Sequence, residues 1–306
     1  MLTLRIVFIT AFALISGCGG QDPGTPFEIG QPYVRAVFED NSSGRLKMSA
    51  KTFVPLSGEG PKVTLMGMIH IGESDFYKNV QDKIDGADLV LFESIGNPYG
   101  DSYSATAFFA PACRTLFGMT DYTTTASALR LSNQYLQYPH ERSIWADLSL
   151  EGFLDQFLRT EFANGLRREL PNGIWDSKCY QLLWLINKGI KAQPDHEFKD
   201  IDFLADPSIV ASKLRNITLS ELTRRAIAEG VATLSERSEY FPGFREVLIE
   251  RRNDVVLHRL RDHLNFGGGE ILIVYGAAHM PDIEARFTKQ FNYVPDRERL
   301  LTAFEF

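Results

Sequence analysis

The chain is poor in cysteine and in concentrated positive charge. Its 306 residues include three cysteines, and none of them forms a C-x-x-C pair, so a zinc site built from thiolates is not expected. The formal net charge is −7 at pH 7, and the basic residues form no long tract. Because nucleic-acid binding depends on clustered positive charge, a nucleic-acid partner is not expected.

Several common catalytic signatures are also missing. The sequence contains no His-Glu-x-x-His, no Gly-x-Ser-x-Gly and no P-loop. These absences exclude the usual zinc-peptidase helix, the serine-hydrolase elbow and the usual phosphate-binding loop. The composition, 44% hydrophobic and 23% charged, is ordinary for a globular protein long enough for one large domain.

The first residues have the features of a bacterial leader. Residues 6–15 are almost wholly apolar but too few to span a bilayer, and the residues before Cys18 resemble a lipobox. We therefore expect residues 1–17 to be a signal peptide, Cys18 to be lipidated, and residues 18–30 to be a flexible tether. An ordinary signal peptide with a chance cysteine is the alternative.

Lipidation of Cys18 would attach the protein to the bacterial cell envelope. Position 19 is Gly and not the Asp that retains some lipoproteins at the inner membrane, which favours the periplasmic face of the outer membrane. We expect Cys113 and Cys179 to be buried free thiols, with a disulfide between them as the alternative.

Two copies of one pattern organise the rest of the chain. Residues 63–70 read V-T-L-M-G-M-I-H, and residues 271–279 read I-L-I-V-Y-G-A-A-H. Each is a short apolar run followed by Gly-x-x-His, which is typical of a buried parallel strand that turns sharply at its end. Residues 88–93 form a third such run, which ends on Glu93.

The neighbouring segments complete an α/β pattern. We expect a hairpin between residues 46–54 and 62–69 and a helix after His70 that ends near Gly86. We also expect helices at residues 125–138, 150–162, 175–188, 244–264 and 281–291 and a last edge strand at residues 299–306. The sequence therefore predicts an α/β fold in one domain, residues 31–306. Its central mixed sheet comes from two strand–Gly-x-x-His–helix units, separated by a large helical insertion at about 100–266.

The strand ends would bring three ionisable side chains together. Carboxyl ends of parallel strands share one edge of a sheet, where open α/β folds bind ligands, so His70, Glu93 and His279 should converge. Two imidazoles and a carboxylate suit a divalent metal ion, which would acidify a bound water. Glu93 could instead be a general base, or the three could be ordinary core and capping residues.

A second polar cluster precedes the second repeat. Arg252 and Asn253 lie in the predicted helix 244–264. They either belong to its solvated face or point to the pocket, where Arg252 would bind a substrate carboxylate or oxyanion. Asp147 is expected to be a helix cap, and the alternative is that it belongs to the site.

These residues resemble the TraB/PrgY/GumN family, which is related to the TIKI proteins, to erythromycin esterases and to ChaN-like haem-binding lipoproteins. The resemblance lies in residues 67–70 and 275–279, in Glu93, and in Arg252 and Asn253. It implies paired α/β units around one site and, for the TIKI branch, metal-dependent peptidase activity. His70, Glu93 and His279 would then be the catalytic metal site, with Arg252 and Asn253 in support.

The first functional hypothesis is thus a membrane-anchored, metal-dependent hydrolase acting on peptide bonds. The alternative is a lipoprotein that binds haem, a peptide or another small ligand without catalysis. An inactive scaffold is the third possibility.

Overall fold

A computed structural model gives the fold of most of the chain. It describes residues 24–40, 43–94, 126–127, 129–134, 136–160, 178–191, 199–206, 208–210, 212–213, 216, 224–234, 245–265 and 268–306. The predicted leader, Cys18 and Cys113 lie outside these residues.

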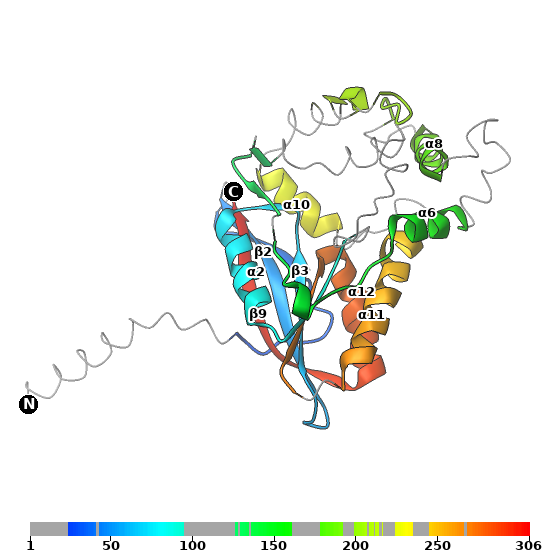
Figure 1. Cartoon of the computed structure of the whole chain (residues 1–306). Coiled ribbons are helices and arrows are strands. Elements are labelled where there is room, and N and C mark those ends of the chain that lie inside the picture. Colours follow the sequence, from blue (N-terminus) through cyan, green and yellow to red (C-terminus); the bar gives the residue numbers. More distant parts are fainter. Residues whose placement is uncertain are drawn as a thin grey trace, which may run out of the picture.

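The centre of the protein is a seven-stranded mixed sheet (Figure 1). Its strands are β1 (Val34–Phe38), β2 (Gly44–Pro55), β3 (Lys62–Met68), β5 (Leu89–Phe92), β7 (Ser143–Trp145), β8 (Glu270–Gly276) and β9 (Tyr293–Glu305). The order is β1-β2-β3-β8-β5-β7, and β9 pairs with β2. A separate two-stranded sheet joins β4 (Ile71–Gly72) to β6 (Ser132–Asn133).

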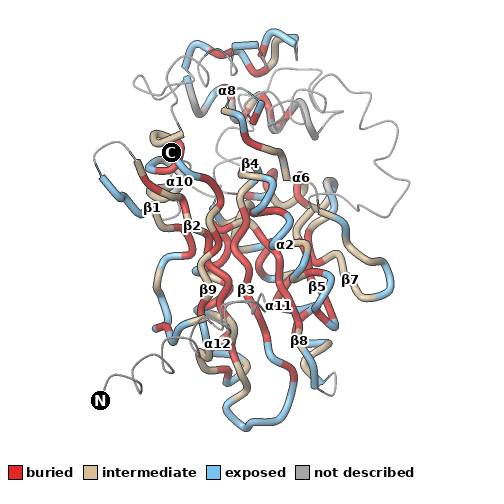
Figure 2. The backbone as a smooth tube through the Cα atoms, turned by 90° about the vertical axis from the view of Figure 1, so that its left-hand side faces the viewer, coloured by how far each residue is buried: buried red, intermediate tan, exposed pale blue. Residues whose placement is uncertain are grey.

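The sheet has an antiparallel half and a parallel half. β2 pairs antiparallel with β1, β3 and β9, whereas β3, β8, β5 and β7 run parallel to one another. Three of these parallel strands, β3, β5 and β8, are almost continuously buried and mostly apolar, and the buried residues follow the middle of the sheet (Figure 2). Since all four parallel strands end at the same edge, the residues that follow them can meet there.

Helices cover both faces of this sheet (Figure 1). The helices are α2 (Ser74–Gly86), η1 (His140–Arg142), α6 (Leu150–Leu158), α8 (Lys178–Lys191), α10 (Arg224–Leu234), η3 (Glu246–Glu250), α11 (Arg251–His263), η4 (Ala277–His279) and α12 (Met280–Phe291). α2 lies on one face, and α11 and α12 lie together on the other. None of the described helices combines the length and apolar character needed to cross a bilayer.

The predicted α/β fold with a mixed sheet is confirmed, as are the first hairpin, the helix after His70 and a last edge strand, although this strand begins earlier than predicted, at Tyr293. One expectation was wrong, and one strand was missed. The helix predicted over 125–138 is interrupted by β6, and Arg130 has a φ of 56° that no helix allows. The strand β7 was not predicted, because three residues are too short for a periodic pattern. The single domain and the helical insertion stay predictions.

A buried ion pair holds the segment before β1 against the sheet and α12. The ammonium of Lys51 in β2 donates to Oε2 of Glu284 at 2.9 Å and to the backbone oxygen of Gln31 at 2.6 Å. Both charged side chains are at most 2% exposed, and Gly30 N–H donates to the other oxygen of Glu284 at 2.7 Å. Each charge loses its contacts with water on burial, and these contacts with the protein replace them.

Replacement of Lys51 by Met should destabilise the fold, because the carboxylate of Glu284 would stay buried without its cation. We expect the free energy of unfolding to fall by about 3–5 kcal/mol, measured by urea denaturation. The double variant Lys51→Met/Glu284→Gln should recover part of the loss. Lys78→Met, at an exposed ion pair on α2, should change stability by less than about 0.5 kcal/mol. An equal effect at the two lysines would contradict this account.

Candidate functional site

The first element of the site is Glu93, which follows β5 directly. Its backbone N–H continues the pairing with β8 by donating to Val274 at 3.0 Å. One carboxylate oxygen accepts the backbone N–H of Gly276, and a Cβ at Gly276 would lie only 3.0 Å from that oxygen. The glycine of the second Gly-x-x-His therefore gives the carboxylate of Glu93 room to lie on the end of β8.

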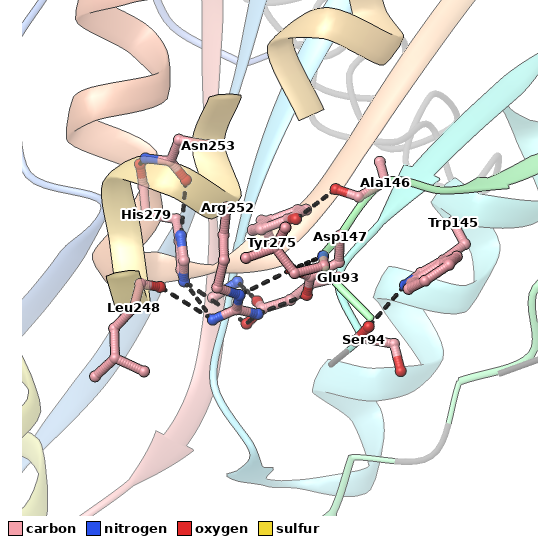
Figure 3. Close-up of polar contacts among 12 residues, drawn as sticks. Glu93, Ser94, Trp145, Ala146, Asp147, Leu248, Arg252, Asn253, Tyr275 and His279 are labelled. Atoms are coloured by element: carbon pink, nitrogen blue, oxygen red, sulfur yellow. Dashed lines mark hydrogen bonds and ion pairs between the residues drawn. The ribbon is translucent and has the colours of Figure 1, made fainter. Parts of the chain in front are cut away.

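The guanidinium of Arg252 occupies the middle of the site (Figure 3). Nε and Nη2 donate to the two oxygens of Asp147 at 2.8 and 2.7 Å, and Nη2 also donates to Glu93 at 2.5 Å. Nη1 donates to Nε2 of His279 at 3.1 Å and to the carbonyl oxygen of Leu248 at 3.2 Å. Since a guanidinium has five N–H groups, every donor of Arg252 has a partner within the protein.

Two features of the chain bring Arg252 to this position. Its helix α11 is preceded by the π-helical turn η3, which contains Leu248. Such turns are rare in proteins, and those that occur are often found at functional sites. The carboxylate of Asp147 is 0% exposed and follows β7, the outermost parallel strand. Asp147 therefore fixes the plane of the guanidinium, and it was not among the main residues that the sequence predicted for the site.

Asn253 fixes the ring of His279. The amide nitrogen of Asn253 donates to Asp282 at 2.8 Å, so its oxygen faces Nδ1 of His279 at 2.7 Å. That nitrogen must carry the proton, because an amide oxygen only accepts. Nε2 of His279 is then the unprotonated nitrogen, in agreement with its contact to Arg252, which only donates.

The burial and the charges of the site set its protonation. Burial by itself would raise the pKa of Glu93, but the charge of Arg252 and the N–H of Gly276 lower this pKa to about 2. Burial lowers the pKa of His279 to about 4, and the charge of Arg252 acts in the same direction while Glu93 opposes it. At neutral pH the site therefore holds an ionised Glu93, a cationic Arg252 and a neutral His279.

The structure brings together four of the five residues that the sequence predicted for the site. Nε2 of His279 lies 3.7 Å from the nearer carboxylate oxygen of Glu93, and Arg252 and Asn253 contact this pair. His70 lies just beyond β3 and is exposed, and its backbone oxygen accepts from Gln134 at 2.9 Å. Within the described part of the chain, no hydrogen bond or ion pair joins the imidazole of His70 to Glu93 or His279.

The predicted metal does not fit this arrangement. The guanidinium of Arg252 contacts both Glu93 and His279, so a second cation between these two side chains would meet a fixed positive charge. With Arg252 in place, no group of three or more histidine, cysteine or acidic side chains among the described residues is arranged to hold a metal ion. The divalent ion at His70, Glu93 and His279 therefore stays a prediction that the observed contacts disfavour.

We found no matching family model, no matching curated protein and no matching solved structure for this chain. The resemblance to the TraB/PrgY/GumN family stays a prediction, and the functional argument rests on the site itself.

Acidification should destabilise the protein through His279. Because its pKa is about 4 in the fold and near 6.5 when unfolded, the unfolded chain binds a proton that the folded chain excludes. The free energy of unfolding should therefore fall by about 3 kcal/mol between pH 6.5 and pH 4. Glu93, whose pKa is also lowered, should add a further loss as the pH falls from about 4.5 to 2.

Urea denaturation at a series of pH values measures this effect, and His279→Gln is the comparison. The variant should lose less stability than the wild type between pH 6.5 and 4, because glutamine does not titrate. Parallel curves for the two proteins would show that the folded histidine has an ordinary pKa.

Proposed function

We propose that the protein is a hydrolase that acts at the carboxyl edge of the parallel strands, with peptide bonds as the first substrate class. One observation carries this proposal: four ionisable side chains from distant parts of the chain converge on one point of that edge. Burial of charges is expensive and seldom needed for stability, and shifted pKa values cluster at functional sites. Such an edge is where open α/β sheets bind ligands.

Glu93 is the member of this group best suited to contact substrate. Its side chain is 19% exposed, whereas Arg252 and His279 are 5% exposed and Asp147 is fully buried. Each of its oxygens accepts one protein hydrogen bond and retains a further lone pair. In the proposed reaction this carboxylate orients the attacking water and accepts its proton as the water attacks. Its pKa of about 2 makes it a weak base, so its main contribution is to hold the water in place.

The other predicted residues take supporting roles in this proposal. Arg252 holds the carboxylate of Glu93 in place by donating to it, and His279 in turn holds the guanidinium by accepting from Nη1. His70, exposed beyond the end of β3, would give a proton to the leaving amine. The predicted binding of substrate charge by Arg252 would require one of its five N–H groups to change partner.

Hydrolysis can be tested with purified protein, quenched fluorescent peptides and small esters. Glu93→Gln should reduce kcat/KM by about 10²- to 10⁴-fold, as removal of a general base does. His70→Ala should reduce the hydrolysis of peptides more than that of phenyl esters. An amine must receive a proton to leave, whereas the phenolate released from a phenyl ester needs none. Glu59→Gln and His258→Ala, both at exposed positions, are the matched controls and should leave the rate unchanged.

Unchanged rates in Glu93→Gln would refute the role of the site. Binding of a peptide or of haem without turnover, lost in His279→Ala, would instead favour the alternative of a ligand-binding lipoprotein.

The proposal includes attachment to a membrane through Cys18, on the sequence pattern before that residue. In a bacterial host, the full chain should incorporate a labelled fatty acid and sediment with the outer membrane. Cys18→Ser should lose the label, while Cys113→Ser should keep it. Label that persists in Cys18→Ser would exclude this anchor.

A further inference from the structure

We propose that Arg252 is the built-in cation of this site: its guanidinium takes the place of a divalent metal ion, and a latent metal site lies beneath it. This inference deepens the proposed function, because it states how the site would obtain its positive charge. It concerns the free protein, however, so its test needs no substrate.

The first argument is the identity of the partners of Arg252. Nη2 lies between oxygens of Glu93 and Asp147, and Nη1 lies against the unprotonated nitrogen of His279. Two carboxylates and a neutral imidazole are ligands that divalent transition metals accept. Each faces the guanidinium with a lone pair, as it would face a metal ion.

The second argument is charge and distance. The two carboxylates carry two negative charges and share one guanidinium, so removal of Arg252 would leave a charge that one divalent ion neutralises. A tetrahedral ion with bonds of about 2 Å separates its ligand atoms by about 3.3 Å. The oxygen of Glu93 and Nε2 of His279 are 3.7 Å apart, so a small movement would allow both to bind one ion.

The third argument is that the contacts of Arg252 are complete. All five N–H groups have acceptors, and the side chain is 5% exposed. Burial alone would lower the pKa of Arg252, but the charges of Glu93 and Asp147 raise it, so the cation cannot be removed by deprotonation. A metal ion could bind these ligands only by displacing Arg252, which would leave a guanidinium without its buried partners.

The test compares metal retention in wild type, Arg252→Ala and Arg252→Lys. Each protein is stripped with a chelator, loaded with Zn²⁺, Mn²⁺ or Co²⁺, freed of excess metal by gel filtration and analysed by elemental mass spectrometry. Wild type and Arg252→Lys should retain no metal at this site, because each keeps a cation there. Arg252→Ala should retain about one equivalent, and its Co²⁺ form should show the visible absorption of a nitrogen- and oxygen-coordinated ion.

Substitution of His279 distinguishes metal bound at the latent site from metal bound elsewhere on the protein. Acidic residues beside α11 line a surface hollow and could hold metal adventitiously; they are Glu246, Glu250, Asp254 and Asp282. Metal at the latent site should disappear in Arg252→Ala/His279→Gln, whereas adventitious metal should remain. Metal that does not depend on His279 in Arg252→Ala would overturn the latent site.

Two other results would also overturn the inference. One is an equivalent of metal in the wild type that His279→Gln removes. The other is a folded Arg252→Ala that binds no metal. If that variant folds only after addition of Zn²⁺ or Mn²⁺, the folding itself reports binding, and failure to fold with either ion counts against the latent site. Loss of hydrolysis in Glu93→Gln, with no metal in the wild type, would support both proposals separately.

Discussion

The guanidinium of Arg252 imposes the strictest requirement in this structure. It carries a permanent charge and five N–H groups, so its burial demands acceptors in five directions. The chain meets this demand with Asp147, Glu93, His279 and a carbonyl of the π-helical turn before α11. These groups come from the ends of β5, β7 and β8 and from the helix that covers them, so the central charge can be satisfied only when the parallel half of the sheet is assembled.

Much of this arrangement follows from short sequence patterns. Apolar runs bounded by glycine gave β3 and β8, and the run ending on Glu93 gave β5. The parallel order of these strands then places Glu93 and His279 on one edge, whatever their separation in sequence. The glycine of each repeat also has a physical reason. Gly276 admits the carboxylate of Glu93, and a Cβ at Gly67 would lie only 3.3 Å from the side chain of Tyr33 and 3.5 Å from that of Ala277.

The features that the sequence did not predict depend on contacts between distant residues, which no local pattern records. β7 has only three residues and owes its place to pairing with β5, so the position of Asp147 at the site could not be derived from periodicity. The same applies to Arg252, whose sequence context, a run of charged residues, equally fits a solvated helix face. His70 shows the opposite case: β4 separates it from the following helix, so the two repeats differ in local structure although their motifs match.

Burial of charge alone does not identify a functional site, and this protein contains the comparison. Lys51 and Glu284 are also buried and paired, but they lie within the core and hold the backbone of Gly30 and Gln31, a structural task. The Arg252 cluster differs in two respects: it lies at the ends of parallel strands, and its Glu93 is 19% exposed whereas Glu284 is 2% exposed. Buried charges that retain one accessible carboxylate at a ligand-binding edge are better explained by chemistry than by stability, since an apolar cluster would hold that edge at least as well.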